Sequence, residues 1–239
     1  MPIIFSIEGN IGSGKSTLVK KLKNYLKQYY HNYYLIYVQE PVNIWESIKD
    51  SKGDSIIKKF YQDQEKYAFS FQMMAYISRL SQIKKIVDIN PNAIIICERS
   101  VWTDKNVFAK MLFDDGKIEE VNFKIYNMWF DEFINQYRLN SIFYVKTDPE
   151  KCAERVNIRS REGENIPLAY LKKCHKYHED WLSLTDRKVV TFDGNVEFID
   201  GIPQEWIDKI ESVINSEIPS NHKISQDDIL MIATAYGCC

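Results

Sequence analysis

The sequence predicts an α/β fold with a five-stranded parallel sheet flanked by helices. Five short runs rich in Ile, Val, Phe or Tyr have the composition of buried strands, at residues 3–7, 34–38, 93–97, 141–145 and 188–192. Long segments compatible with helices separate these runs, an alternation that is typical of a parallel sheet covered by helices. A glycine-rich segment directly follows the first run and has the pattern of a phosphate-binding loop.

The glycine-rich segment, GNIGSGKST at residues 9–17, is the motif around which the chain is organised. The pattern requires a glycine, four further residues, and then Gly14, Lys15 and Ser16. Glycines let the backbone N–H groups turn toward phosphate oxygens, Lys15 adds positive charge, and the Ser16 hydroxyl can ligate Mg²⁺. A chance match is disfavoured, because the motif lies between a strand-like run and an amphipathic helix. We expect nucleotide contacts from Gly9, Asn10, Ile11, Gly12, Ser13, Gly14, Lys15, Ser16 and Thr17.

Helices are expected in the long segments between and after the strands. The first should begin at Ser16, and residues 54–88 and 121–137 are also compatible with helices. Asp148 and Pro149 have the character of an N-cap and a first turn, and further helices should cover residues 167–184 and 203–215. We therefore expect one domain over residues 1–215 and a C-terminal appendage of unknown role over residues 216–239.

Composition narrows the functional class. The formal net charge of −2 provides no basic field for a nucleic-acid backbone, so we expect no nucleic-acid partner. Five cysteines form no CxxC pair, which indicates a reduced, cytoplasmic environment. No apolar run approaches the length of a membrane span and the N-terminus lacks the form of a signal peptide, so we expect no membrane association. The terminal Cys238-Cys239 lacks a polybasic segment, which favours an unmodified terminus over a prenylation site.

Three of the predicted strands lead into groups suited to phosphoryl chemistry. The first leads into the phosphate loop, the second is followed by Glu40, and the third by Glu98 and Arg99. Ligands bind outside the carboxyl ends of the strands in an open parallel sheet, so these groups should meet. Alone, each carboxylate would more often be a helix cap or a surface charge. Together they provide a base for a hydroxyl acceptor, a ligand for Mg²⁺ and a cation for a transferred phosphoryl group.

Seven segments together resemble the deoxyribonucleoside kinases: GNIGSGKST, QEPV, FSFQ, SRL, CERSVWTD, RVNIRSREGEN and IPLAYLKKCHKYHEDWL. The resemblance extends over about residues 3–214, in order and with compatible spacing. It implies a P-loop kinase fold with an arginine-bearing lid. It also implies transfer of the γ-phosphoryl group of ATP, or of another nucleoside triphosphate, to the 5′-hydroxyl of a deoxyribonucleoside in nucleotide salvage, with Mg²⁺ as cofactor.

The resemblance implies roles at the reacting end of the site. Glu40 is similar to the carboxylate that acts as base toward the 5′-hydroxyl, and Arg99 to the arginine that holds the 5′ end and the phosphoryl group. Glu98 resembles the carboxylate beside Mg²⁺, where the Ser16 hydroxyl is the other protein ligand. Glu98 is also an alternative base, and the sequence leaves the two assignments open. Lys15 is expected to contribute to catalysis through its charge.

For the nucleoside, the resemblance implies four further contacts. Gln72 is similar to the amide that reads the base, and Phe108 to the aromatic ring that stacks on it. Tyr61 and Glu164 resemble the residues that bind the 3′-hydroxyl. A homodimer is also implied, and residues 111–113 and 121–133 are aromatic enough to form its interface.

For the nucleotide, the resemblance implies a set of lid arginines, Arg155, Arg159 and Arg161. Asp193 lies where the family's loop meets the adenine of ATP. The lid after Arg161 is one residue shorter than the family pattern, and Glu164 lies in this shorter segment.

The choice of base depends on the neighbours of Gln72. Its amide offers a donor beside an acceptor and can flip, so alone it could pair with any base edge. Arg79 and Asp104 match the charged pair of the deoxycytidine and purine branch, whereas members that accept thymidine have apolar residues there. A carboxylate accepts from an exocyclic amine, and a crowded charged pair disfavours a 5-methyl group. We therefore expect deoxycytidine or a purine deoxynucleoside rather than thymidine; the alternative is a purely structural Arg79–Asp104 salt bridge.

Two other functions compete with this interpretation. A nucleoside-monophosphate kinase of thymidylate type shares the sheet and the phosphate loop, but it needs an arginine-rich pocket for a 5′-monophosphate. The QEP and FSFQ segments disfavour it. A nucleotide-binding module without catalysis is disfavoured because Lys15, Glu40 and Arg99 are all present.

Overall fold

All five predicted strands form one parallel sheet. The computed structural model describes residues 1–30, 33–159, 166–198 and 201–219. The strands are β1 (Ile3–Glu8), β2 (Leu35–Val38), β3 (Ile94–Glu98), β4 (Ser141–Lys146) and β5 (Lys188–Asp193). They pair in parallel in the order β2-β3-β1-β4-β5. Because β1 is the central strand, the loop that follows it lies in the middle of the carboxyl edge.

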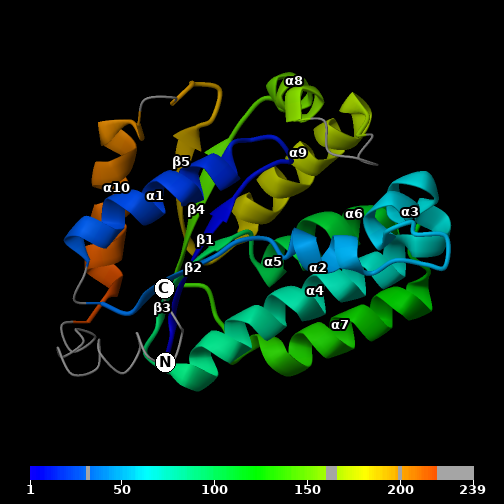
Figure 1. Ribbon diagram of the computed structural model, residues 1–239, viewed down its shortest axis with the longest axis horizontal. Helices are drawn as coiled ribbons and strands as arrows, with labels where there is room; N and C mark the ends of the chain where they lie inside the picture. Colours follow the sequence, from blue (N-terminus) through cyan, green and yellow to red (C-terminus); the bar gives the residue numbers. More distant parts are fainter. Residues whose placement is uncertain (31–32, 160–165, 199–200, 220–239) are drawn as a thin grey trace.

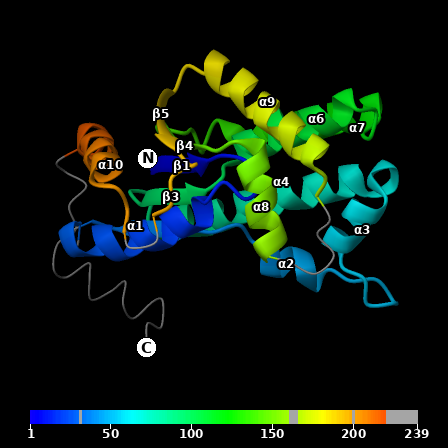
Figure 2. The ribbon, with the colours of Figure 1, turned by 90° about the horizontal axis from the view of Figure 1, so that it is seen from above.

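Helices cover both faces of this sheet, as the alternation of elements predicts. The helices α1 (Lys15–Tyr29) and α10 (Gln204–Glu217) lie on one face, and α4 (Gln64–Ile89) and α9 (Leu168–Leu184) on the other (Figures 1 and 2). Neighbouring residues of β1 point to opposite faces. Phe5 and Ile7 pack with α1 and α10, whereas Ile4 packs in the core cluster that includes α4. Both faces are therefore dry, and ligands can approach only at the strand ends.

The segment at residues 54–88 contains two helices, α3 (Ile56–Gln62) and α4. Asp63 separates them, and its side chain accepts a hydrogen bond from the Lys66 N–H as the N-cap of α4. The other peripheral helices are α2 (Val42–Ser47), α7 (Glu120–Ile134) and α8 (Pro149–Arg159), and α7 packs along α4 (Figure 1).

Residues 101–114 form helical structure that the sequence analysis does not predict. The short helix α5 (Val101–Thr103) continues into the π-helical segment η1 (Asp104–Ala109) and then into α6 (Lys110–Asp114). In this wider turn the Lys110 N–H bonds to the carbonyl of Lys105, five residues earlier. The π-helical turn carries Asp104 and Phe108, two of the predicted base-binding residues.

One part of the expected dimer surface is wrong. Met111 and Leu112 are completely buried and only Phe113 is partly exposed, so the first two of these residues belong to the core rather than to a surface. Residues 160–165, with Arg161 and Glu164, and residues 220–239 lie outside the described part of the chain. The expected division of the chain at residue 215 therefore stays a prediction. Within the described residues, none of the helices combines the length and apolar character that a membrane crossing requires.

Candidate active site

The phosphate loop has the backbone that its glycines permit. Gly9 and Gly12 have φ values of 146° and 80°, which L side chains rarely adopt. A Cβ atom at Gly9 would lie 2.5 Å from the carbonyl oxygen of Val145, and one at Gly12 would lie 2.5 Å from that of Cys152. The loop is thus pressed against β4 and α8, and no side chain could be added at either position without moving the backbone.

Lys15 is buried beneath the loop. Its Nζ donates to the Asn10 carbonyl at 2.6 Å, and the Ser13 hydroxyl lies 3.4 Å away. Burial, together with the charge of Arg99, lowers the pKa of Lys15 to about 8. A bound triphosphate would place negative charge beside this ammonium group. The pKa of Lys15 would then rise, because a nearby anion favours the protonated form.

Polar contacts hold the loop from outside. The Asn10 side chain donates to the Leu171 carbonyl on α9 at 2.8 Å. Arg155 donates to the carbonyl of Gly194 at 2.8 Å and to that of Ser13 at 3.4 Å, so it joins the loop to the segment after β5. Asp193, at the end of β5, is exposed and accepts from the Asn195 N–H at 3.0 Å.

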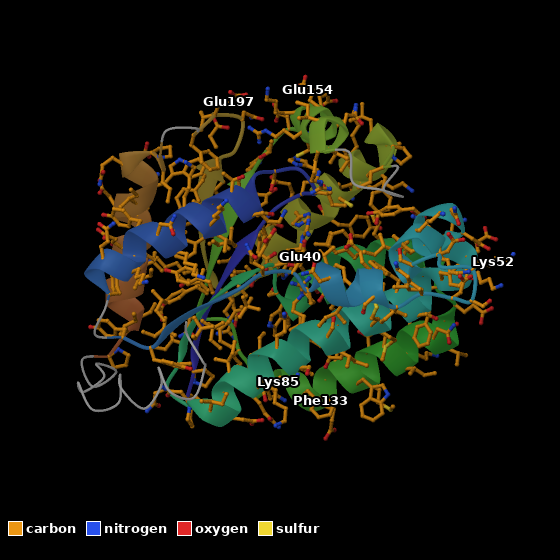
Figure 3. The ribbon with its side chains drawn as sticks, in the orientation of Figure 1. Glu40, Lys52, Lys85, Phe133, Glu154 and Glu197 are labelled. Carbon is orange, nitrogen blue, oxygen red and sulfur yellow. The ribbon has the colours of Figure 1, made fainter. Side chains whose placement is uncertain are left out.

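Glu40 lies between two arginines. Arg99 Nη1 donates to Glu40 Oε1 at 2.5 Å, and Arg79 Nη2 lies 3.3 Å from the same oxygen. Burial alone would raise the pKa of Glu40, but the charges of Arg99, Arg79 and Lys15 outweigh it and lower the pKa to about 2. Glu40 is therefore ionised at neutral pH, near the centre of the molecule, where the sheet meets α2 and α4 (Figure 3).

Arg99 has an unusual backbone. Its φ of 58° is the one positive value among the described non-glycine residues. Its N–H bonds to the Ile7 carbonyl at 3.0 Å, and its Nη2 donates to the Gly9 carbonyl at 3.3 Å. The guanidinium carbon lies 5.1 Å from the ring centre of Phe108. Arg99 thus links the phosphate loop to Glu40 and to the π-helical turn.

A cavity of about 300 Å³ joins these groups. At one end it is lined by the phosphate loop and Glu98, and at the other by side chains from α2, α4 and η1. The predicted residues that line it are Ile11, Gly12, Gly14, Lys15, Ser16, Glu40, Tyr61, Gln72, Arg79, Glu98, Arg99, Asp104, Phe108 and Arg159. The volume is within the range of small-molecule sites.

Gln72 and the Arg79–Asp104 pair line the cavity from α4 and η1. The buried Gln72 Oε1 has no hydrogen-bond partner, the condition expected of an amide that awaits a ligand. Arg79 Nε donates to Asp104 Oδ2 at 2.9 Å and its Nη1 to the Glu98 carbonyl at 2.8 Å. Arg79 and Asp104 side chains are only 1% and 3% exposed, so the ion pair is buried as well as lining the cavity.

The sequence analysis missed several side chains of the site. Trp45, Phe71 and Tyr170 also line the cavity, and Trp45 donates its indole N–H to Ser78 at 2.9 Å. The sequence shows that these residues are aromatic, but it does not distinguish an aromatic side chain that lines a cavity from one in the core. Glu8 was also missed, although it is the last residue of β1 and directly precedes the phosphate loop.

Ser16 and Glu98 fit a magnesium site. The Ser16 hydroxyl donates to Glu98 Oε1 at 2.5 Å at the mouth of the phosphate loop. Hydroxyl and carboxylate oxygens are hard donors of the kind that Mg²⁺ prefers. Among the described residues, no three His, Cys, Asp or Glu side chains cluster closely enough to hold a metal. At a site with two protein ligands, phosphate oxygens of a nucleotide and water would complete the coordination of Mg²⁺.

Comparisons with known proteins show which family the chain belongs to. A family model described as Deoxynucleoside kinase matches residues 5–215. The chain belongs to this family. It is 34% identical to deoxycytidine kinase 2 of Gallus gallus, over 88% of this chain and 90% of the relative. It is 36% identical to the probable deoxycytidine kinase of fowlpox virus (strain NVSL), over 82% and 80%.

Another relative is a kinase that is named for a purine deoxynucleoside. Identity to the mitochondrial deoxyguanosine kinase of Xenopus laevis is 30%, over 74% of this chain and 72% of the relative. The chain is thus a deoxynucleoside kinase, an ATP-dependent phosphotransferase, and the thymidylate-kinase and non-catalytic alternatives are set aside. The P-loop kinase fold is confirmed, and the family implies a nucleotide as phosphate donor.

Proposed function

We propose that this kinase transfers the γ-phosphoryl group of ATP to the 5′-hydroxyl of deoxycytidine or a purine deoxynucleoside, in preference to thymidine, and that it serves nucleotide salvage. The observation that carries the proposal is the buried Arg79–Asp104 pair beside the unpartnered Gln72 amide oxygen. Relatives named as deoxycytidine and deoxyguanosine kinases support the same choice.

In this proposal, Glu40 orients the 5′-hydroxyl and accepts its proton as the phosphoryl group transfers. A carboxylate whose pKa is about 2 is a weak base. Phosphoryl transfer through a loose transition state needs little proton abstraction before the P–O bond to the leaving group breaks. Orientation is therefore the larger part of the role of Glu40, and Arg99, 2.5 Å from its carboxylate, holds it in place.

The phosphate end would stabilise the transferred charge. Backbone N–H groups of residues 9–17 and the Lys15 ammonium would bind the β- and γ-phosphates. Mg²⁺, held through Ser16 and Glu98, would neutralise charge on the phosphates. Arg155, Arg159 and Arg161 would approach from the lid, and Asp193 would lie near the adenine. In the described structure Arg155 already donates to the Ser13 carbonyl of the loop.

The base end would select the nucleoside. Asp104 can accept a hydrogen bond from an exocyclic amine, which cytosine and adenine have and thymine lacks. Gln72 would complete the pairing, and Phe108 would stack on the ring. Tyr61, half-buried in the cavity wall, would contact the sugar, together with Glu164.

A homodimer is also proposed, through α7. Four apolar side chains on this helix are well exposed: Val121, Ile125, Met128 and Trp129, at 66%, 38%, 60% and 44%. Trp129 stacks on Phe133, which lies at the outer surface of α7 in Figure 3. A contiguous apolar face of this kind is typical of a subunit interface.

The test is a labelled phosphoryl-transfer assay with the purified chain, ATP, Mg²⁺ and each of the four deoxynucleosides. We expect 5′-monophosphate products from deoxycytidine or a purine deoxynucleoside, with the highest kcat/KM for one of them. Thymidine as the best substrate would contradict the proposed base selection. Label on a hydroxyl other than the 5′ position would contradict the proposed reaction itself.

A further inference from the structure

Glu8 is a completely buried carboxylate that the roles described above do not use. It ends β1, immediately before Gly9. Ser100 Oγ donates to its Oε1 at 2.7 Å, and the Thr103 hydroxyl donates to its Oε2. Both donors are themselves buried; Ser100 directly follows Arg99, and Thr103 lies three residues after Ser100. The carboxylate therefore ties the strand that enters the phosphate loop to the segment that carries Arg99.

The two hydroxyls are diverted from their usual local partners. Ser100 stands at the N-cap of α5, where a serine side chain ordinarily accepts from a backbone N–H of the first turn. Here its side chain makes no capping bond and donates to Glu8 instead. Thr103, three residues later, also donates to Glu8 rather than to a carbonyl of its own helix.

Arg99 lies immediately before Ser100, in a backbone conformation that needs support. A positive φ at a non-glycine residue costs free energy and persists only where its surroundings hold it. Its N–H is held by Ile7 and its side chain by the Gly9 carbonyl. Glu8, between these two residues of the chain, holds Ser100. Ile7, Glu8 and Gly9, which are consecutive, thus contact the Arg99 N–H, the Ser100 side chain and the Arg99 side chain.

We propose that Glu8 is a positioning residue, which clamps Ser100 and Thr103 so that Arg99 keeps the orientation in which its guanidinium meets Glu40 and the phosphate loop. The clamp also fixes the start of the π-helical turn, since Asp104 directly follows Thr103. The inference depends on the proposed role of Arg99 in phosphoryl transfer.

Ser100→Ala and Thr103→Val test the clamp, with Ser141→Ala as the matched control. Ser141 is equally buried and also donates to a carboxylate, that of Glu217 at 3.2 Å, but at the start of β4, away from the site. We expect kcat to fall about tenfold in each clamp variant, with KM for ATP and nucleoside changed less than about threefold. Ser141→Ala should keep the wild-type kcat while its melting temperature falls by a similar amount.

Glu8 itself is tested by a pair of variants. Glu8→Gln keeps an acceptor for one hydroxyl and can donate to the other, so it should retain most of kcat. Glu8→Ala leaves both buried hydroxyls unpartnered, so this variant should lose most of kcat or fail to fold. In either case the clamp variants remain informative, because they leave Glu8 in place.

A double-variant cycle separates positioning from general stability. If the clamp acts through Arg99, Ser100→Ala should have less than a twofold further effect on kcat in an Arg99→Lys background. Full additivity, or an equal loss of kcat in Ser141→Ala, would overturn the clamp. An Arg99→Lys enzyme with wild-type kcat would overturn the proposed role of Arg99 and the clamp with it. A slow Arg99→Lys enzyme beside a full-speed Ser100→Ala enzyme would overturn the clamp alone.

Discussion

The two ends of the cavity are built in different ways. The phosphate end comes from nine consecutive residues, 9–17, whose backbone is shaped by glycines and held by β4, α8 and α9. The base end comes from side chains on α2, α4 and the π-helical turn η1, which lie up to about 60 residues apart in the chain. In the proposed function, main-chain N–H groups would bind any triphosphate, whereas the side chains at the other end would discriminate among the bases.

This difference predicts how damage to each end should appear. A change at the phosphate end removes interactions with the triphosphate, which is the same for every nucleoside. The value of kcat/KM should therefore fall by the same factor for all nucleosides. A change at the base end alters interactions with the base, which is the part that differs among nucleosides. Selectivity should therefore change more than the rate on the best substrate.

Lys15→Ala should have the largest effect. Loss of a preorganised charge beside the transferred phosphoryl group should reduce kcat/KM on the order of 10³-fold, equally for every nucleoside accepted. Circular dichroism should show an unchanged fold, because the ammonium group contacts the loop rather than the apolar core. A folded Lys15→Ala enzyme with wild-type activity would contradict the assignment of the phosphate loop.

Glu40→Gln should come next. The amide keeps the shape but loses the charge that pairs with Arg99 and the acceptor for the 5′-hydroxyl proton, so kcat should fall about 10²-fold. Nucleoside binding, measured by calorimetry, should change less. If Glu98→Gln is slow without any change in Mg²⁺ dependence while Glu40→Gln remains active, the roles of the two carboxylates must be exchanged.

Single substitutions in the buried ion pair should reduce stability. Arg79→Met leaves the buried Asp104 charge without its partner, and Asp104→Ala leaves Arg79 with the longer ion pair to Glu40, at 3.3 Å. Removal of one member of a buried pair costs about 3–5 kcal/mol. Denaturant unfolding should show this loss in each single variant and a smaller loss in the double variant. A loss in the double variant equal to the sum of the two single losses would mean that the two side chains act independently.

The pH dependence of the rate should show a smaller effect, at the alkaline side alone. The pKa of Lys15 is lowered to about 8, so its charge is lost as pH rises through that value, and kcat/KM for ATP should fall about tenfold per unit above it. Glu40, whose pKa is lowered to about 2, stays ionised far below neutrality. Rates from about pH 4 to 9.5 on wild type, Lys15→Arg and Glu40→Gln check this. An acid limb near pH 4.5 that disappears in Glu40→Gln would contradict the low pKa.

The same contrast explains what the sequence could predict. All five strands and the phosphate loop were predictable, because buried strands and a contiguous motif are local features. Glu40, Glu98 and Arg99 followed from one topological rule, that parallel strands deliver their ends to one edge. Family resemblance, rather than periodicity, supplied the base-end residues.

What the sequence did not reveal depends on tertiary contacts. The π-helical turn shifts the register of residues 104–109, so no regular period marks it. The aromatic content of the sequence around Met111 suggested a dimer surface, but Met111 is buried in a helix that contacts α9. In the sequence Glu8 resembles any charged residue at the end of a strand, and only the positions of Ser100 and Thr103 indicate its proposed role.

The most direct test compares selectivity in three enzymes. The ratio of kcat/KM for deoxycytidine, or for the best purine deoxynucleoside, to that for thymidine is measured in wild type, Lys15→Ala and Arg79→Met/Asp104→Ala. We predict the same ratio in wild type and Lys15→Ala despite the large loss of rate. The double variant should shift the ratio toward thymidine by 10- to 100-fold, about 1.4–2.8 kcal/mol of transition-state binding. A ratio that is unmoved in the double variant, or that changes as much in Lys15→Ala, would contradict the separation of the two ends.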